Sequence, residues 1–147
     1  MITQTQQALD AAIRSVLIPE LPTGFSYGGC TVEWTQALGS YAQGELRSTH
    51  RRKLVIGYVP SCNERKEVLL IHVENMEGDT FSVPEFAKHT DTSAEKLCLD
   101  ITQYEGSLSD RIESTLRANV LVLTGSLANV IAGQEWVHVP MDWGDYK

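Results

Sequence analysis

The sequence lacks the segments that place a protein in or across a membrane. No apolar run in its 147 residues approaches the roughly 20 that a transmembrane helix needs. The opening stretch, MITQTQQALD, has neither the basic start nor the apolar core of a signal peptide. We therefore expect a protein of the cytoplasm of the producing cell that makes no membrane contact.

Cysteine and basic charge are also scarce. The three cysteines, Cys30, Cys62 and Cys98, are odd in number and far apart, so their spacing implies neither a disulfide framework nor a zinc knuckle. Twelve basic residues against 19 acidic ones give a net charge of −7, which argues against general nucleic-acid binding. The same charge suits a small acidic inhibitor or immunity protein that docks on a basic protein partner.

Motifs for phosphate binding, nucleophilic catalysis and metal binding are missing as well. The chain contains no glycine-rich phosphate loop and no G-x-S-x-G elbow. His72 and Glu74 share one face of a predicted strand, but a zinc site needs three or four ligands and no third is evident. We therefore predict no catalytic residue, no cofactor and no metal site.

What is present is a pattern of helices and strands that predicts one α+β domain over residues 1–147, with a mostly antiparallel sheet. Apolar residues recur at helical spacing from Ile2 to Leu17, and Pro19 and Pro22 end this N-terminal helix. Alternating or β-branched segments predict the first three strands. These strands are Cys30–Thr35, Lys53–Val59 and Glu67–Asn75.

Residues 96–104 fit two kinds of structure. Leu97, Leu99 and Ile101 alternate with polar residues as they would on a strand, and we favour a strand because the period is two. A helix is the rival, since the stretch TSAE that begins at Thr92 has the form of a capping box.

A second helix is predicted near residues 108–119, with Ser107 as its N-cap. Residues 120–124 are apolar on all sides, so they either continue this helix or form a buried strand. Residues 36–52 and 76–92 show no clear period, and their structure stays open.

The last segment is predicted as a closing β-hairpin over residues 126–143. Gly133 and Gln134 are its turn, because a glycine at the first position of a two-residue loop suits a type II′ turn. Pro140 lacks a ladder donor, which places the final strand at or near an edge. In this register Val137, Val139, Met141 and Trp143 share the core face, and Trp136, His138, Pro140 and Asp142 share the other.

Two groups of residues are candidates for a protein interface. The stretch RSTHRRK holds four of the twelve basic residues in seven positions, which forms a basic patch or, equally well, a solvated loop. The tail offers exposed aromatic residues, which are enriched at interfaces. The candidates are Arg47, Arg51, Arg52, Lys53, Trp136, His138 and Tyr146.

Two resemblances bear on function. The stretches LIHVE and WVHVP, around His72 and His138, are similar to the strands of two-histidine phosphoesterases. In that family a Thr or Ser follows each His by two residues and helps to hold phosphate beside the general acid and base. Here Glu74 and Pro140 occupy those positions, so the similarity departs from the family on the chemistry itself. The enzyme is therefore the third of our three hypotheses.

The second resemblance is to the tail-terminator, or tail-completion, proteins of long-tailed phages. The stretches MITQTQQALDAAIRSVL, EKLCLDITQYEGSLSDRIESTLR and GQEWVHVPMDW resemble that group in order of parts. The resemblance implies a non-enzymatic virion protein that forms a ring, usually of six copies. Such a ring caps the tail tube and binds other tail or head-connector proteins. This is our leading hypothesis, and the acidic inhibitor is the second.

Overall fold

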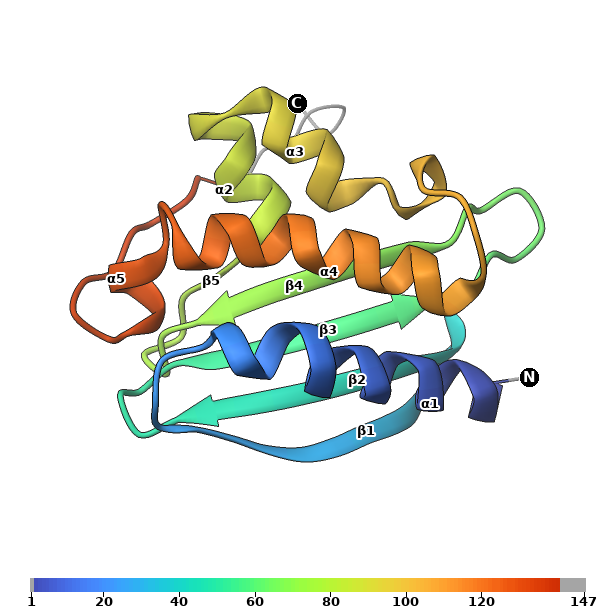
Figure 1. The fold of residues 1–147 in the computed structure, drawn as a ribbon, viewed down its shortest axis with the longest axis horizontal. Helices are drawn as coiled ribbons and strands as arrows, with labels where there is room; N and C mark the ends of the chain where they lie inside the picture. Colours follow the sequence, from blue (N-terminus) through green and yellow to red (C-terminus); the bar gives the residue numbers. More distant parts are fainter. Residues whose placement is uncertain (1, 141–147) are drawn as a thin grey trace.

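A five-stranded antiparallel sheet forms one layer of the protein, and helices α1 and α4 cover one of its faces (Figure 1). The computed structural model describes residues 2–140, and within them the α+β class is confirmed. The strands are β1 (Phe25–Thr35), β2 (Gly39–Ser48), β3 (Lys53–Val59), β4 (Val68–Glu74) and β5 (Thr80–Ser82). The helices are α1 (Ile2–Ala12), α2 (Val83–Thr90), α3 (Thr92–Leu99), α4 (Leu108–Thr124) and α5 (Ala128–Ile131), with short turns η1 (Ile13–Leu17), η2 (Ile18–Glu20) and η3 (Ile101–Gln103).

The strands follow one another in space as they do in sequence, in the order β1-β2-β3-β4-β5. The registers pair Leu46 with Leu54 and Leu54 with Val73, so the alternating apolar residues of neighbouring strands meet on the face that α1 and α4 cover. β1 and β5 are the two edges of the sheet. α2 and α3 follow β5 and lie on the side of the fold opposite to β1 (Figure 1).

α1 approaches the sheet closely because β2 carries a glycine beneath it. A Cβ at Gly44 would stand 2.6 Å from the side chain of Ile13. Asp10 then fixes the helix to β1, since its Oδ1 accepts hydrogen bonds from the Tyr27 hydroxyl at 2.6 Å and the Cys30 amide at 3.2 Å. The predicted N-terminal helix is confirmed, and the turns η1 and η2 continue it to Glu20.

The second predicted helix is confirmed and is longer than expected. Ser107 caps α4 in a capping box with Asp110. Buried Leu116, Val120 and Leu123 follow one another at helical spacing, so residues 120–124 belong to the helix and not to a strand.

Residues 96–99 belong to α3 and residues 101–103 form η3, which corrects our preference for a strand over residues 96–104. The N-cap of α3 is Asp91, one residue before the predicted capping box, and it accepts from the amides of Ser93 and Ala94. Cys98 is buried whereas Leu97 is exposed, the reverse of the faces that an alternating strand would give.

The segments left open by the sequence also contain regular structure. Residues 36–52 include β2 and the turns on either side of it. Residues 76–92 include β5 and α2, which begins at a capping box between Ser82 and Glu85.

The closing hairpin is not present over residues 126–140, and the remainder of the predicted segment lies outside the described residues. Leu127, Val130 and Ile131 are all buried and are spaced for a helix, and α5 forms there instead of a strand. Gly133, with φ +80°, ends this helical turn as a left-handed residue just after its C-cap. The chain then runs on to Pro140 without entering the sheet.

Candidate protein-protein interface

The predicted basic patch is neutralised by acidic neighbours on the same surface. Glu74 raises the pKa of Lys53 by accepting a hydrogen bond from it. The ion pairs are Arg47 with Glu45 (3.1 Å), Arg51 with Glu77 (2.6 Å), and Lys53 with Glu45 (3.3 Å) and Glu74 (2.9 Å). The pairs of Arg47 and Arg51 are exposed and contribute little stability, whereas Lys53 is half-buried. Together the acidic partners cancel most of the positive field of the patch.

Arg52 differs from its basic neighbours because it is buried, with 7% of its surface exposed. Its Nε donates to the carbonyl of Val130 at 2.7 Å and its Nη2 to the carbonyl of Glu135 at 2.8 Å. The guanidinium also lies 5.1 Å from the centre of the Trp136 ring, in cation–π contact. Arg52 therefore holds the segment that follows α5 against the turn between β2 and β3.

Trp136 is half-buried, and the contacts that cover it come from its own chain. Its ring lies 5.2 Å from that of Phe81, and its Nε1 donates to Asp79 Oδ2 at 2.8 Å. The same carboxylate oxygen is 3.0 Å from His138 Nδ1. Hydrogen bonds from Trp136 and His138 hold the pKa of Asp79 below its usual value. The imidazole of His138 is largely exposed, and Tyr146 lies outside the described residues.

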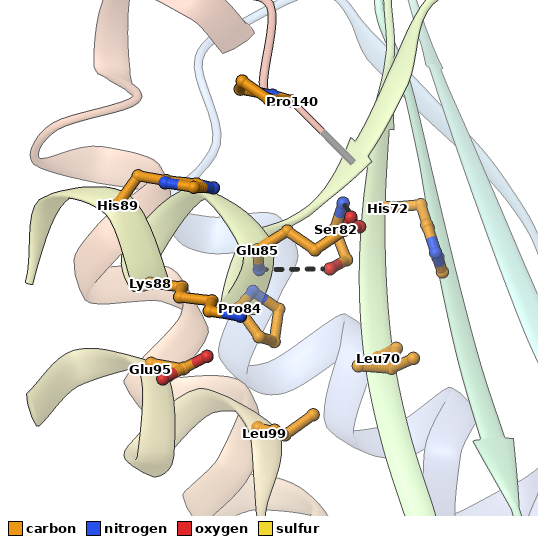
Figure 2. Close-up of a pocket in the computed structure, with 10 residues that line it drawn as sticks. All are labelled: Leu70, His72, Ser82, Pro84, Glu85, Lys88, His89, Glu95, Leu99 and Pro140. Carbon is orange, nitrogen blue, oxygen red and sulfur yellow. Dashed lines mark hydrogen bonds between the residues drawn. The ribbon is translucent and has the colours of Figure 1, made fainter. Parts of the chain in front are cut away.

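The two histidines of the phosphoesterase hypothesis have different surroundings. His72 lines a cavity of about 360 Å³ at the edge of β4, together with His89 and Glu85 of α2, and burial lowers its pKa (Figure 2). His138 does not line this cavity, and its imidazole is hydrogen-bonded to Asp79 instead. Within residues 2–140 no three His, Cys, Asp or Glu side chains are grouped as metal ligands.

β1 is an exposed edge strand, and it carries two large apolar side chains. It pairs with β2 alone among the described strands, and residues 31–34 are all exposed. Val32 is 40% and Trp34 is 67% exposed, on the same face of the strand, and we call this pair the hairpin knob. Natural edge strands are commonly protected by Lys, Pro or a bulge. β1 contains neither Lys nor Pro, and its irregularity lies between Tyr27 and Cys30, before the exposed residues 31–34.

Arg65 holds the hairpin that carries the knob in place. Its guanidinium donates to the carbonyls of Ala37 (3.3 Å), Leu38 (3.1 Å) and Pro60 (2.9 Å). These bonds tie the turn between β1 and β2 to the loop after β3. The knob is therefore presented on a fixed strand and not on a loose loop.

A shallow apolar groove lies on the other side of the fold, between α2 and α3 on one wall and the C-terminal half of α4 on the other. Its volume is about 300 Å³. Leu97, which is 46% exposed, and Leu121, which is 74% exposed, both line it, and Ala94 and Ala118 contribute small side chains. We call this feature the helical groove.

The knob and the groove were both missed at the level of sequence. CTVEWT was predicted as a strand, and its alternation already places Val32 and Trp34 on one face, but only the strand order shows that this face lies at an edge. The groove depends on α2, which the sequence did not predict, and on α3, which it offered only as the rival to a strand.

Comparisons of the chain with protein-family models, with curated proteins and with solved structures give no match. No helix within residues 2–140 is long and apolar enough to cross a membrane. The arrangement of side chains on the fold is therefore the basis for an inference of function.

Proposed function

We propose that the chain is a non-enzymatic assembly protein that associates with further copies of itself. The observation that carries this proposal is the exposed edge strand β1 with Val32 and Trp34 on one face. Residues 31–34, the regular and exposed part of this edge, offer unpaired backbone groups to another chain, and tryptophan is among the residue types enriched at interface hot spots. Edge and knob together make the β1–β2 hairpin a contact surface.

In the assembly that we propose, the copies form a ring of the tail-terminator kind, which ends a tail tube and joins it to a head connector. Support for the ring comes from two of the three stretches of the resemblance, which form the N-terminal helix and the α3–α4 region. The third stretch, GQEWVHVPMDW, is not a hairpin strand up to Pro140. The proposal therefore depends more on the edge strand than on the resemblance.

The decisive measurement is the mass of the purified protein as a function of concentration, by native mass spectrometry and sedimentation velocity. We expect oligomers that grow with concentration. A strict monomer at every concentration would contradict the proposal and leave the inhibitor of a basic partner as the better account of the negative charge.

A charge introduced on edge strand β1 tests whether this strand makes the contact between copies. Val32→Lys puts a cation on the exposed face of β1, which is a known way to block edge contacts. We expect it to weaken self-association by about tenfold or more, because an ammonium has to lose its water in the contact. Gln36→Lys adds the same charge in the neighbouring turn and is the matched control, with association expected to stay near that of the unmodified protein.

A further inference from the structure

The cavity beside His72 is lined in part by the last residue that the structure describes. β4 contributes one wall, residues of α2 and α3 form the other, and Pro140 lies at one end (Figure 2). The chain before Pro140 is held in place, because the indole of Trp136 is hydrogen-bonded to Asp79. The residue after Pro140 therefore begins beside the cavity, since consecutive Cα atoms are about 3.8 Å apart.

We propose that this cavity holds the chain's own C-terminal segment, residues 141–143, with the indole of Trp143 inside it. Met141 and Trp143 give this segment two large apolar side chains. Leu70 and Leu99 line the cavity and offer an apolar surface to them, and Leu99 is 42% exposed within residues 2–140. The volume is about 360 Å³. An apolar cavity of about 150 Å³ is enough to hold benzene, so the indole fits.

The length of the connection favours the cavity of the same chain over that of a second copy. Trp143 is three residues beyond Pro140, and three extended residues reach about 10 Å. A connection this short gives an effective concentration on the order of millimolar, which exceeds the concentration of a second copy in a dilute sample. The contact therefore forms within one copy, and the inference does not rest on the proposed function.

The C-terminal segment also brings a carboxylate to the cavity, because it contains Asp142. Of the described residues that line the cavity, Lys88 is the only lysine or arginine. The other ionisable residues of the lining are His72, Glu85, His89 and Glu95. Glu85 is engaged in the capping box at the start of α2. The carboxylate of Asp142 therefore pairs with the ammonium of Lys88 when the segment is seated, which fixes the direction in which the chain enters the cavity.

A seated C-terminal segment determines what the cavity can bind. With the indole of Trp143 between β4 and the helices, a phosphate ester does not reach His72 or His89. The cavity is then a part of the fold that the chain fills itself, and it is not the substrate site of a two-histidine phosphoesterase.

The fluorescence of Trp143 tests the proposal directly. With Trp34→Phe and Trp136→Phe in place, Trp143 is the only tryptophan of this background protein, and acrylamide quenching reports its contact with water. At a dilution where the protein is monomeric, we expect weaker quenching than that of free tryptophan amide. Leu99→Asp places a carboxylate in the cavity and should lower the ratio of seated to free segment by about tenfold or more, so quenching should rise toward that of the amide.

Leu97→Asp is the matched control for that variant. Leu97 lies on the same helix as Leu99 and is 46% exposed, but it does not line this cavity. Quenching of Trp143 should stay as in the background protein. Both leucines are exposed, so the circular dichroism spectra of the two variants should match that of the background protein.

A double-mutant cycle tests the charge pair without a change to the apolar lining. Lys88→Ala and Asp142→Ala, made singly and together in the otherwise unmodified protein, should be coupled by about twofold to fivefold in the unfolding equilibrium constant, as ion pairs near a surface are. Urea denaturation measures that constant. Lys88→Ala with Asp145→Ala is the control cycle, because Asp145 lies beyond residues 141–143, and these two changes should be independent of each other.

Three outcomes would overturn the inference. The first is Trp143 quenched as readily as the free amide, and the second is equal quenching in Leu99→Asp and Leu97→Asp. The third is protection of Trp143 only at concentrations where the protein associates, because the segment would then occupy the cavity of a second copy. Independence of Lys88 and Asp142 would overturn the charge pair. None of these results changes the mass measurement that decides the proposed function, so the two can fail separately.

Discussion

The two edges of the sheet carry a tryptophan each, and the two side chains have opposite surroundings. At the β5 edge, Trp136 contacts the ring of Phe81, lies under the guanidinium of Arg52 and donates to Asp79. At the β1 edge, Trp34 is 67% exposed. β5 is also only three residues long and leads directly into α2, whereas β1 has 11 residues.

The difference shows that this fold covers the β5 edge with its own chain. At the β1 edge α1 bonds the backbone of Cys30 through Gln6 and Asp10, and residues 31–34 stay exposed. The segment after α5 covers the β5 edge. Arg52 donates to its Glu135 carbonyl, and its Trp136 donates to Asp79. An edge strand left uncovered favours pairing with another chain, so proteins usually protect both edges. The contrast between the two edges is the physical basis for assigning stability to one region and assembly to the other.

The covered edge depends most on Arg52, and replacing it should have the largest effect on stability. Arg52→Ala removes a buried cation together with its three hydrogen bonds, and it leaves the carbonyls of Arg51, Val130 and Glu135 without that donor. We expect the free energy of unfolding to fall by about 3 kcal/mol, since bonds to charged groups contribute about 1.5–3 kcal/mol each and are not additive. Urea denaturation followed by circular dichroism measures the change.

Arg51→Ala is the control for that experiment, because it removes the neighbouring guanidinium from an exposed ion pair with Glu77. Its cost should be below about 0.5 kcal/mol. If Arg51→Ala and Arg52→Ala lower the free energy of unfolding equally, the charge of this turn is what stabilises the fold, and the contact of Arg52 with the segment after α5 is not.

A smaller effect, with a defined pH dependence, is expected at Asp79. Its carboxylate accepts from Trp136 and His138, and these bonds lower its pKa in the folded state. The stability that they provide is present above the unfolded pKa, near about 3.9, and is lost as the pH falls through the folded value. Asp79→Ala should cost about 1 kcal/mol at neutral pH.

The measurement is the free energy of unfolding of both proteins between pH 7 and pH 3. The difference in free energy of unfolding between the unmodified protein and Asp79→Ala should become smaller toward acid pH, because the protonated carboxyl no longer favours the folded state. Glu77→Ala, in the same turn, is the control and should give a small gap. A gap that widens toward acid pH would contradict the assigned role of the Asp79 carboxylate.

The strands were more predictable from sequence than the C-terminal segments. Lys53–Val59 was predicted with the bounds that β3 has, and Glu67–Asn75 extends β4 by one residue at each end, because alternation in the middle of a sheet is a local signal. The hairpin prediction was wrong over residues 126–140, because the spacing of Leu127, Val130 and Ile131 suits a short helix as well as a strand. Gly133 follows that helix with a positive φ, which the first position of a type II′ hairpin turn also requires.

The candidate surfaces were less predictable than the fold, because they depend on contacts between distant residues. Arg52 and Glu135 are 83 positions apart, and no local pattern pairs them. The sequence singled out Arg52 and Trp136 as candidates for an interface between chains. In the structure the two side chains contact each other at the β5 edge. It gave no sign of Trp34 as an edge residue, since an edge is defined by the order of all the strands.

The smallest effect on stability is expected at the uncovered edge, and it is the sharpest test of the comparison. Trp34→Phe should change the free energy of unfolding by less than about 0.5 kcal/mol, because its side chain is largely in water already. Trp136→Phe keeps the aromatic contact with Phe81 but loses the bond to Asp79, so it should cost about 1 kcal/mol.

Fluorescence quenching by acrylamide, measured at a dilution where the protein is monomeric, then reports the exposure of each ring. In a Trp143→Phe background, which leaves only these two rings, Trp34→Phe should remove most of the readily quenched emission, whereas Trp136→Phe should remove emission that is quenched slowly. At concentrations that drive assembly, the emission lost through Trp34→Phe should become protected in the unmodified protein, because the ring leaves water at the contact. If Trp34 stays equally accessible to acrylamide in the oligomer, the uncovered edge is not the surface that assembles, and the division of roles between the two edges fails.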